Sequence, residues 1–324
     1  MPKNSFEPLS LLYYLIKSAR PRQWVKNLAV YAALLFSGFL FYIPNNGTPY
    51  LLTVTWAFVL FSMLTGSIYL INDVVDIKAD KNHPFKSKRP IAAGKLPAWL
   101  ALSAAGLGIL VVFALSFMLN PYFRLLLLAY LVLQLFYFTV LKHIPIFDVV
   151  SIATGFLIRV YAGAVIVDLH PSVWFLLTVM SASLFLAVAK RQSERTLLKN
   201  SKEELGSTRK ILTRYSQRLL DQYTSMFATA TWLTYALFTF QQQASQPVNL
   251  YGTVYSFLPR AWRSEKLLML TIPLVIFAVM RYLQLVYENN RGESPDKVLF
   301  SDRPLLISAL SFGILVFVII YILR

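Results

Sequence analysis

The sequence predicts an all-α protein, a polytopic integral membrane helical bundle of about nine transmembrane helices. Hydrophobic residues make up 57% of the 324 residues and charged residues only 14%, against about 25% charged residues in a typical soluble domain. The apolar residues come in long blocks of about 20, which span a bilayer as helices because every backbone hydrogen bond closes inside the segment. Tracts of alternating polar and apolar residues are absent, and this argues against a β-barrel.

Nine apolar blocks are long enough to be predicted as spans. They are Trp24–Ile43, Tyr50–Ile71, Pro97–Leu119, Tyr122–Leu141, Ile146–Asp168, Pro171–Ala189, Asp221–Gln243, Lys266–Tyr287 and Pro304–Leu323. The shorter stretch Leu9–Ile16 is followed by basic residues and fits an interfacial helix better than a signal peptide. We expect one domain over residues 1–324, in which residues 1–23 are a cytoplasmic or interfacial segment. The chain has no cysteine, which excludes a disulfide framework.

The net charge of +16 predicts the orientation of the protein in the membrane. Nucleic acid is one partner for such a charge, but the positive-inside rule explains it better. With a cytoplasmic N-terminus, 25 of the 31 Lys and Arg fall on the cytoplasmic side, in residues 1–26, 72–96, 142–145, 190–220 and 281–303. We therefore expect a protein of a bacterial inner or plasma membrane with a cytoplasmic active site and no nucleic-acid partner. The long loop Gln246–Arg263 should lie on the opposite face.

An acidic motif stands at the cytoplasmic end of the second predicted span. Its members recur every three or four residues, which places them on one helix face: Asn72, Asp73, Asp76 and Asp80. Like charges this close repel each other, so the motif predicts a bound cation, and oxygen ligands of this kind suit Mg²⁺. The alternative is a solvated helix end paired with neighbouring lysines. Carboxylates disfavour a helix C-terminus through the macrodipole, which weakens that alternative.

A basic loop follows the acidic motif. Pro90 cannot continue a helix from the residues before it, and Lys86 and Arg89 precede it. Such cations can hold phosphate oxygens, and Arg does so with a bidentate fork. Ordinary positive-inside charge is the competing interpretation. The nearby acidic motif favours Lys86 and Arg89 as phosphate ligands.

These motifs resemble the UbiA superfamily of intramembrane prenyltransferases. The acidic motif followed by Lys88-Arg89-Pro90 resembles the first signature of that family. The run Arg20-Pro-Arg-Gln-Trp-Val-Lys26-Asn resembles its opening motif, and Tyr137-x-x-x-Leu-Lys142 resembles a third element. The resemblance covers the whole chain. It implies a helical bundle with a central cavity, Mg²⁺ at the cytoplasmic mouth and a polyprenyl chain in a groove open to lipid.

The chain departs from that family after the sixth predicted span. A second Asp-rich motif is usual there, whereas this chain reads Lys190-Arg191-Gln-Ser-Glu194-Arg195. Two cations in place of carboxylates favour direct phosphate binding, although positive-inside charge is an alternative. The pattern resembles the decaprenyl-phosphate phosphoribosyltransferase branch of the superfamily. The segments Arg291–Pro295 and Asp302–Pro304 also resemble that branch, as does Asp148 with the run Gly155–Arg159.

Arg159 lies inside a predicted span. A charged residue there is costly and usually faces the interior of the bundle. Asp148 precedes it by eleven residues, about three turns, so both side chains share a helix face and both could point into the cavity. The alternative is that Arg159 snorkels to the outer interface.

The resulting hypothesis is a Mg²⁺-dependent transfer of a 5-phosphoribosyl group. Phosphoribosyl diphosphate would be the donor, and a polyprenyl phosphate lipid would be the acceptor. A UbiA-type prenyltransferase that moves a prenyl group to an aromatic acceptor is the second reading, and the missing second Asp motif argues against it. A transporter is a distant third, because neither repeats nor midplane acids are present. The oligomeric state stays open, a homo-oligomer included.

The candidate residues divide into three groups. The proposed catalytic residues are Asp73, Asp76 and Lys190, and the metal ligands are Asn72, Asp73, Asp76 and Asp80. The substrate-binding candidates are Arg20, Lys26, Lys86, Arg89, Tyr137, Lys142, Arg159, Lys190, Arg191 and Glu194.

Overall fold

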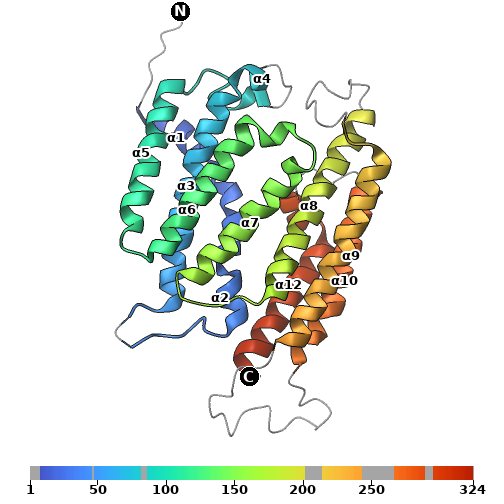
Figure 1. Cartoon of the computed structure of the whole chain (residues 1–324). Coiled ribbons are helices and arrows are strands. Elements are labelled where there is room, and N and C mark those ends of the chain that lie inside the picture. The colour runs from blue at the N-terminus through green and yellow to red at the C-terminus, as the bar shows by residue number, and fades with distance from the viewer. Residues whose placement is uncertain are drawn as a thin grey trace, which may run out of the picture. The chain divides into compact units, whose positions relative to one another are not determined.

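The computed structural model describes residues 8–45, 47–81, 86–200, 214–242, 266–288 and 295–323 (Figure 1). Within those ranges all regular structure is helical. The α-helices are α1 (Pro8–Ser18), α2 (Ala32–Ser37), α3 (Tyr50–Val75), α4 (Ile77–Lys81), α5 (Ala98–Ser116), α6 (Pro121–Thr139), α7 (Phe147–Val165), α8 (Val173–Asn200), α9 (Gln217–Gln241), α10 (Ile272–Tyr287), α11 (Pro295–Ser301) and α12 (Arg303–Phe317). The described residues also form four 3₁₀ helices: η1 (Pro21–Tyr31), η2 (Lys86–Lys88), η3 (Leu141–His143) and η7 (Leu267–Thr271). The π-helix η8 (Val318–Ile322) follows α12. The all-α prediction is confirmed.

Among the described residues, seven helices are long and apolar enough to cross a membrane. Their bounds are Tyr50–Val75, Ala98–Ser116, Pro121–Thr139, Phe147–Val165, Val173–Thr196, Leu267–Tyr287 and Arg303–Ile322. The predicted count of nine is not confirmed. In place of the first predicted span lie the 3₁₀ helix η1, which carries Arg22 and Lys26, and the six-residue α2. In place of the seventh lies α9, which is long enough but too rich in Thr and Gln to be as apolar as the others.

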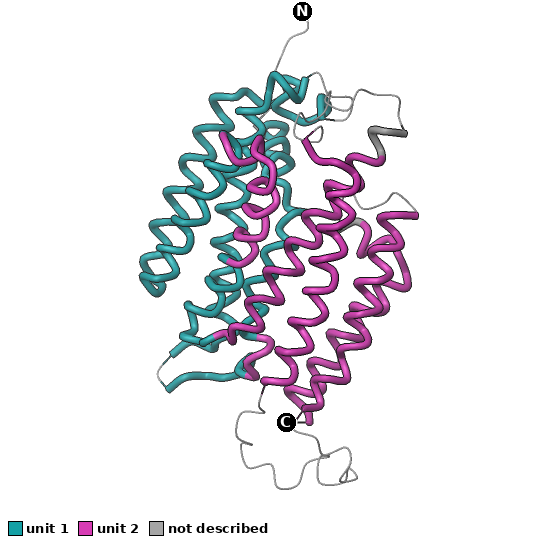
Figure 2. Tube along the Cα trace, turned by 45° about the vertical axis from the view of Figure 1, so that its right-hand side comes forward, with its two compact units in different colours: residues 1–34, 39–139, 158–170 teal, residues 35–38, 140–157, 171–324 magenta. Residues whose placement is uncertain are grey.

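The chain forms two compact units (Figure 2). Unit 1 contains residues 1–34, 39–139 and 158–170, and unit 2 contains residues 35–38, 140–157 and 171–324. Helix α7 therefore belongs to unit 2 in its first half and to unit 1 in its second half. The single domain expected over residues 1–324 stays a prediction.

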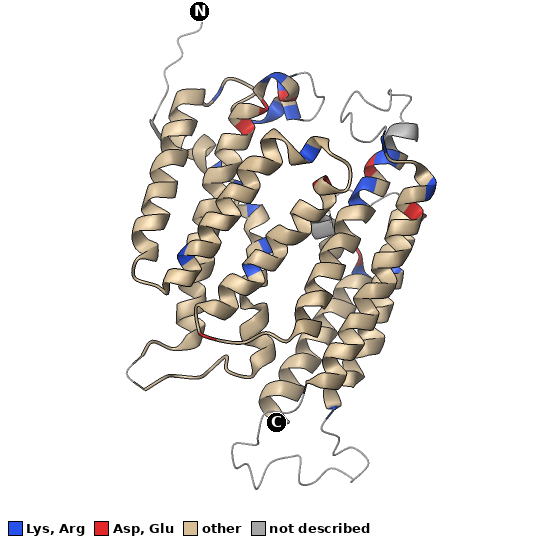
Figure 3. Ribbon diagram, viewed as in Figure 1, with Lys and Arg blue, Asp and Glu red and all other residues tan. Residues whose placement is uncertain are grey.

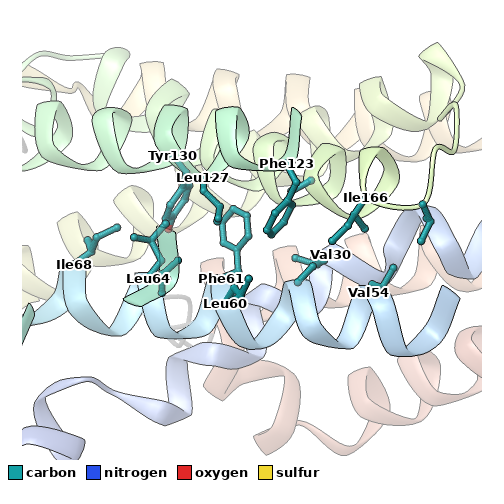
Figure 4. Packing of buried hydrophobic residues seen from close by; sticks show 14 of the residues in the cluster. Val30, Val54, Leu60, Phe61, Leu64, Ile68, Phe123, Leu127, Tyr130 and Ile166 are labelled. Carbon is teal, nitrogen blue, oxygen red and sulfur yellow. The ribbon is translucent and has the colours of Figure 1, made fainter. Parts of the chain in front are cut away.

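The core of unit 1 is built around α3. Phe61 stacks edge-on against Phe123 and Tyr130 of α6, with ring centroids 6.3 and 5.1 Å apart (Figure 4). Helix α7 approaches η1 so closely that a Cβ on Gly163 would lie 1.7 Å from the carbonyl oxygen of Val30. Only glycine permits this contact, because any side chain would overlap the backbone of η1.

The N-terminal helix α1 has two apolar faces. Leu11, Tyr14 and Leu15 pack against the buried cluster of α3 and α5 that includes Leu70 and Leu96. Four other apolar side chains of the helix are exposed: Leu9, Leu12, Tyr13 and Ile16. An exposed apolar face of this kind suits the membrane interface, and that location of α1 stays a prediction.

The core of unit 2 joins α8, α9, α10 and α12. Phe36 of α2 packs against Phe175 of α8 and Phe238 of α9, with centroids 5.4 Å away in both cases. The backbone of α2 is held as well: Tyr321 donates to the carbonyl oxygen of Leu35, and Gln242 donates to that of Phe36. These contacts explain why residues 35–38 belong to unit 2.

Two helices run further than the sequence predicted. Helix α3 continues to Val75, so Asn72 and Asp73 lie on its last turn. Helix α8 continues to Asn200, beyond the predicted end of the sixth span at Ala189, so the Lys190–Arg195 run lies on this helix. The run is rich in good helix formers, and an Arg191–Glu194 pair at spacing i,i+3 supports the extension.

Candidate active site

The acidic motif of unit 1 lies where α3 gives way to α4. Charged residues gather at this end of unit 1, beside α4 (Figure 3). Asp76 ends α3, and the hydrogen-bond ladder continues through the break, because Asp80 N donates to Asp76 O at 2.8 Å. Asp73 and Asp80 are both buried, at 2% and 3% exposure, whereas Asn72 and Asp76 are half-buried.

Two guanidinium groups hold these carboxylates. Arg89 Nη1 lies 2.5 Å from Asp80 Oδ2 and 3.2 Å from Asp73 Oδ1. Arg20 Nη2 donates to the same Oδ1 of Asp73. Asp73 and Asp80 are therefore paired with arginines, one from the N-terminal flank of η1 and one from the basic loop.

One face of α3 meets the chain around Arg20. Tyr69 and Asp73 lie on this face, and the Arg20 guanidinium stacks over the Tyr69 ring at 4.8 Å from the centroid. Gly66 lies on the same face one turn away, where a Cβ would stand 3.8 Å from Trp24 Nε1. The buried indole N–H of Trp24 has no hydrogen-bond partner in the described part of the chain.

The donor chemistry at this end fits Mg²⁺. The ion takes hard oxygen ligands and commonly uses one or two carboxylates together with water and substrate phosphates. Asp73 and Asp80 supply such oxygens, and a guanidinium already stands between them, which shows that the spot accommodates positive charge. Among the described residues, no three Asp, Glu or His side chains converge as a complete metal cage. The remaining ligands would therefore come from water and substrate.

Arg159 lies in the interior of unit 1 with only 7% of its surface exposed. Its Nε donates to Asn27 Oδ1 at 2.9 Å, and its Nη2 donates to Tyr130 OH at 2.5 Å. Asn27 in turn donates to Ser62 and Thr65 of α3, each at 3.1 Å. The inward-facing prediction for Arg159 is confirmed, and the snorkelling alternative is wrong. Satisfied hydrogen bonds make this position for a cation within a span tolerable.

Unit 2 holds a second cluster of charges, at the start of α7 and on α8. Arg191 Nε lies 2.9 Å from Asp148 Oδ2, and its Nη1 lies 2.5 Å from Glu194 Oε2. Arg191 and Asp148 are each 1% exposed. An arginine so completely enclosed by two carboxylates is built into the fold, which argues against the predicted phosphate contact of Arg191.

Tyr215 completes this cluster. Its hydroxyl donates to Asp148 Oδ1 at 2.6 Å and accepts from the backbone N–H of Ile146 at 2.6 Å. Burial raises the pKa of the Tyr215 hydroxyl, and the hydrogen bond to Asp148 raises it further, so the proton stays on the tyrosine near neutral pH. Ile146 has a φ of 72°, a strained conformation for a β-branched residue. The bond from Tyr215 helps to hold the chain in this conformation.

Comparison with known proteins identifies the family. The model of the UbiA prenyltransferase family matches residues 30–301. The protein belongs to the UbiA prenyltransferase family. It is therefore an enzyme of a membrane-embedded family, and its apolar helices mark it as an integral membrane protein. This membership confirms the resemblance noted in the sequence and speaks against the transporter alternative.

Relatives with curated names share most of the chain. A decaprenyl-phosphate phosphoribosyltransferase of Mycolicibacterium smegmatis is 34% identical over 310 residues, covering 94% of this chain and 92% of the relative. A decaprenyl-phosphate phosphoribosyltransferase of Corynebacterium glutamicum is 35% identical over 323 residues, covering 99% of this chain and 91% of the relative. A solved UbiA homolog from Archaeoglobus fulgidus, bound to GPP and Mg²⁺, matches with a TM-score of 0.65 at 18% identity, covering 95% of this chain and 99% of that one. This last likeness shows the UbiA fold alone.

The other predicted residues are spread over the two units of this UbiA chain. Unit 1 carries Lys26 on η1, Lys86 on η2 and Tyr137 on α6, where Tyr137 packs against the apolar core. Unit 2 carries Lys142 on η3 and Lys190 on α8, both half-buried. Asp148 bonds to Arg191 and Tyr215 within unit 2, and Arg159 bonds to Asn27 and Tyr130 within unit 1.

The C-terminal motifs are only partly within the described residues. Asp302 caps α12, accepting from Leu305 N at 3.0 Å, and Arg281 of α10 donates to both its carboxylate oxygens at 3.1 and 2.8 Å. These contacts support a structural role for Asp302. Residues 291–294 and the predicted outer loop 246–263 lie outside the described residues.

The sequence pattern indicated no role for three residues of these networks: Trp24, Asn27 and Tyr215. Trp24 and Asn27 belong to the opening motif, which was a usable signal. Tyr215 carried no such signal, because tyrosines at membrane boundaries are common without any site.

Proposed function

We propose that this enzyme transfers a 5-phosphoribosyl group from phosphoribosyl diphosphate to a polyprenyl phosphate. The observation that carries the proposal is the similarity to decaprenyl-phosphate phosphoribosyltransferases over more than nine-tenths of both chains. This chain also lacks the second Asp-rich motif of the family and has Lys190 and Arg191 at that place. That replacement agrees with the proposed function. The acidic motif at the end of α3 is the proposed place for the donor diphosphate.

The residues of unit 1 suit the binding of a diphosphate. Arg20 and Arg89 each expose about a quarter of the side chain, 26% and 25%, so both guanidiniums are within reach of a ligand. Charge-assisted bonds from arginine to phosphate oxygens are short and strong. The proposed metal ligands are Asn72, Asp73, Asp76 and Asp80. Bound Mg²⁺ would offset the negative charge that grows on the departing diphosphate.

The reaction requires little from the protein beyond binding and orientation. An oxygen of the acceptor phosphate bonds to the anomeric carbon of the ribose, and the bond from that carbon to the diphosphate oxygen breaks. Diphosphate leaves with the electron pair, through a transition state of oxocarbenium character. The acceptor is already anionic near neutral pH, so no strong general base is needed. Lys190 is the proposed phosphate ligand of α8, and Arg20 and Arg89 orient the leaving group.

Incubation of the purified enzyme with Mg²⁺, ribose-labelled phosphoribosyl diphosphate and a polyprenyl phosphate tests this proposal. We expect the label to become extractable into organic solvent, and the acceptor must be present for this to occur. A parallel reaction should contain a labelled prenyl diphosphate and an aromatic acid. Prenylation of the aromatic acid without ribosylation of the lipid would establish the alternative prenyltransferase reading.

A further inference from the structure

In the described part of each unit an arginine bridges two carboxylates, and the two bridging arginines differ in exposure. In unit 2, Arg191 lies between Asp148 and Glu194 with 1% of its side chain exposed. In unit 1, Arg89 lies between Asp73 and Asp80 with 25% exposed. Separating the fully buried Arg191 pair would leave an uncompensated charge. The Arg89 side chain is partly exposed although Asp73 and Asp80 are buried, so it can move to solvent or to another anion when a second cation takes its place at the carboxylates. Arg89 is therefore the displaceable bridge.

The position of Arg89 opposes the binding of a bare divalent cation. Its Nη1 lies within 3.2 Å of an oxygen from each carboxylate, so it occupies the space between the proposed metal-ligating groups. A metal ion at 2.0–2.1 Å from the same oxygens would overlap with the guanidinium and be repelled by it. Arg20 adds a second positive charge against Asp73. Two guanidiniums and the three carboxylates of the motif leave one formal negative charge, which does not balance a lone divalent ion.

A diphosphate reverses this balance. It brings several negative charges and many acceptor oxygens, which can receive the guanidinium that the metal displaces from the carboxylates. The backbone of Arg89 is held in place, because its N–H donates to Lys86 O at 3.0 Å and its carbonyl accepts from Ala93 N at 2.8 Å. Only the side chain needs to swing. Arg20 pairs with Asp73 and stacks on Tyr69, so it can stay as the counter-ion.

We propose that Arg89 determines what the α3–α4 carboxylates accept: it excludes the bare metal ion and admits the metal–diphosphate complex. The inference rests on the proposed function for its metal and its diphosphate, and it adds the selectivity between free and complexed metal. Arg89 thereby becomes a specificity-determining residue whose guanidinium changes partner, from carboxylate to phosphate, as the complex binds. Metal and diphosphate should consequently bind together and not in sequence with the metal first.

Binding of Mn²⁺, followed by electron paramagnetic resonance on the full-length purified protein, tests this without catalysis. The wild type should bind Mn²⁺ weakly, and inorganic diphosphate should tighten binding about tenfold or more. In Arg89→Gln, Mn²⁺ alone should bind about tenfold tighter than to the wild type, because the competing charge is gone. The additional effect of diphosphate should shrink in the same variant, because the phosphate oxygens have lost a donor.

Lys88→Ala is the matched control. Lys88 is exposed, carries the same charge and precedes Arg89 by one residue. We expect its Mn²⁺ affinity to stay within about twofold of the wild type, since surface charges are strongly screened. Equal tightening in Lys88→Ala and Arg89→Gln would reduce the effect to general electrostatics and overturn the proposal. Wild-type affinity in Arg89→Gln would overturn it as well.

A substitute variant and two further outcomes complete the experiment. If Arg89→Gln does not fold, Arg89→Lys replaces it, and a smaller tightening is expected because a single ammonium bridges two carboxylates less well than a guanidinium fork. Absence of Mn²⁺ binding in every variant, with diphosphate present, would refute the metal assignment and this proposal together. The expected Mn²⁺ pattern without ribosyl transfer would uphold the role of Arg89 while rejecting the proposed donor.

Discussion

Arg191 and Asp148 form an ion pair in unit 2 from which water is almost completely excluded, with Nε and Oδ2 2.9 Å apart and each side chain 1% exposed. The pair ties α8 to the start of α7, and Tyr215 and Glu194 bond to its two ends. Its members are 43 residues apart in the chain. The arginine that the sequence offered as a phosphate ligand is thus enclosed by carboxylates of its own unit.

We predict that Arg191→Gln lowers stability strongly. Removing one partner of a buried ion pair costs about 3–5 kcal/mol, because the other charge stays buried without compensation. Thermal unfolding in detergent should show a large fall in melting temperature, and Arg218→Gln, at an exposed cation of α9, should show none. An unchanged melting temperature with a raised KM for the donor would contradict this prediction and support Arg191 as a phosphate ligand.

Activity should require a divalent cation and should be lost in Asp73→Asn and in Asp76→Asn. Each substitution removes one negative charge from the proposed metal-binding end of α3 and leaves the size of the side chain unchanged. The ribosyl-transfer assay with and without chelator measures the loss. Asp168→Asn, outside the motif, serves as the control. Full activity in either motif variant, or in excess chelator, would contradict the assignment of these residues as metal ligands.

Lys190→Ala should raise the KM for the phosphorylated donor more than that for the lipid acceptor. Lys190 is half-buried on α8, next to the enclosed Arg191. Loss of a charge-assisted hydrogen bond of about 1.5–3 kcal/mol corresponds to roughly ten- to hundredfold in kcat/KM. Kinetics with each substrate varied separately measure it, with Arg218→Ala as the control. If kcat/KM for the donor does not change, Lys190 is only a positive-inside charge.

Gly163→Ala should destabilise unit 1. The added methyl group would stand 1.7 Å from the carbonyl oxygen of Val30, which is backbone and cannot rotate away. Overpacking of this kind typically costs about 1–3 kcal/mol. Gly106→Ala in α5 is the matched control, because a Cβ there meets no atom within 4 Å and alanine favours the helix. A melting temperature equal to that of the wild type in Gly163→Ala would contradict the close approach of α7 to η1.

The predicted orientation can be tested by labelling, since the chain has no cysteine of its own. Single cysteines at Ser87 and Arg218 should be shielded from an impermeant thiol reagent on intact cells, whereas one at Thr48 should react. The positive-inside distribution is the reason, because Ser87 and Arg218 lie in the most basic segments. Permeabilised cells, in which Ser87→Cys and Arg218→Cys should both label, provide the control. Reaction at Ser87→Cys or Arg218→Cys without permeabilisation would contradict the predicted cytoplasmic location of these segments.

The sequence alone determined the features that depend on local pattern. Apolar blocks predicted the membrane helices, because a segment without polar groups must satisfy its backbone as a helix in lipid. The spacing of Asp73 and Asp80 predicted a shared helix face, and both meet Arg89 in the structure. Local pattern failed at Trp24–Ile43, where η1 and α2 replace a regular span. It could not anticipate this, because the tight contact with Gly163 comes from a distant helix.

Only the tertiary structure decided the partner of each charge. Arg20, Arg89, Arg159 and Arg191 look alike in the sequence, as cations near apolar helices. In the structure the partly exposed Arg20 and Arg89 pair with buried carboxylates of the acidic motif, Arg159 bonds to Asn27 and Tyr130, and Arg191 is enclosed by Asp148 and Glu194. Partner choice depends on which side chains the packing of distant helices brings within about 3 Å, and on how much water remains there. Neither quantity has a signature in the order of residues along the chain.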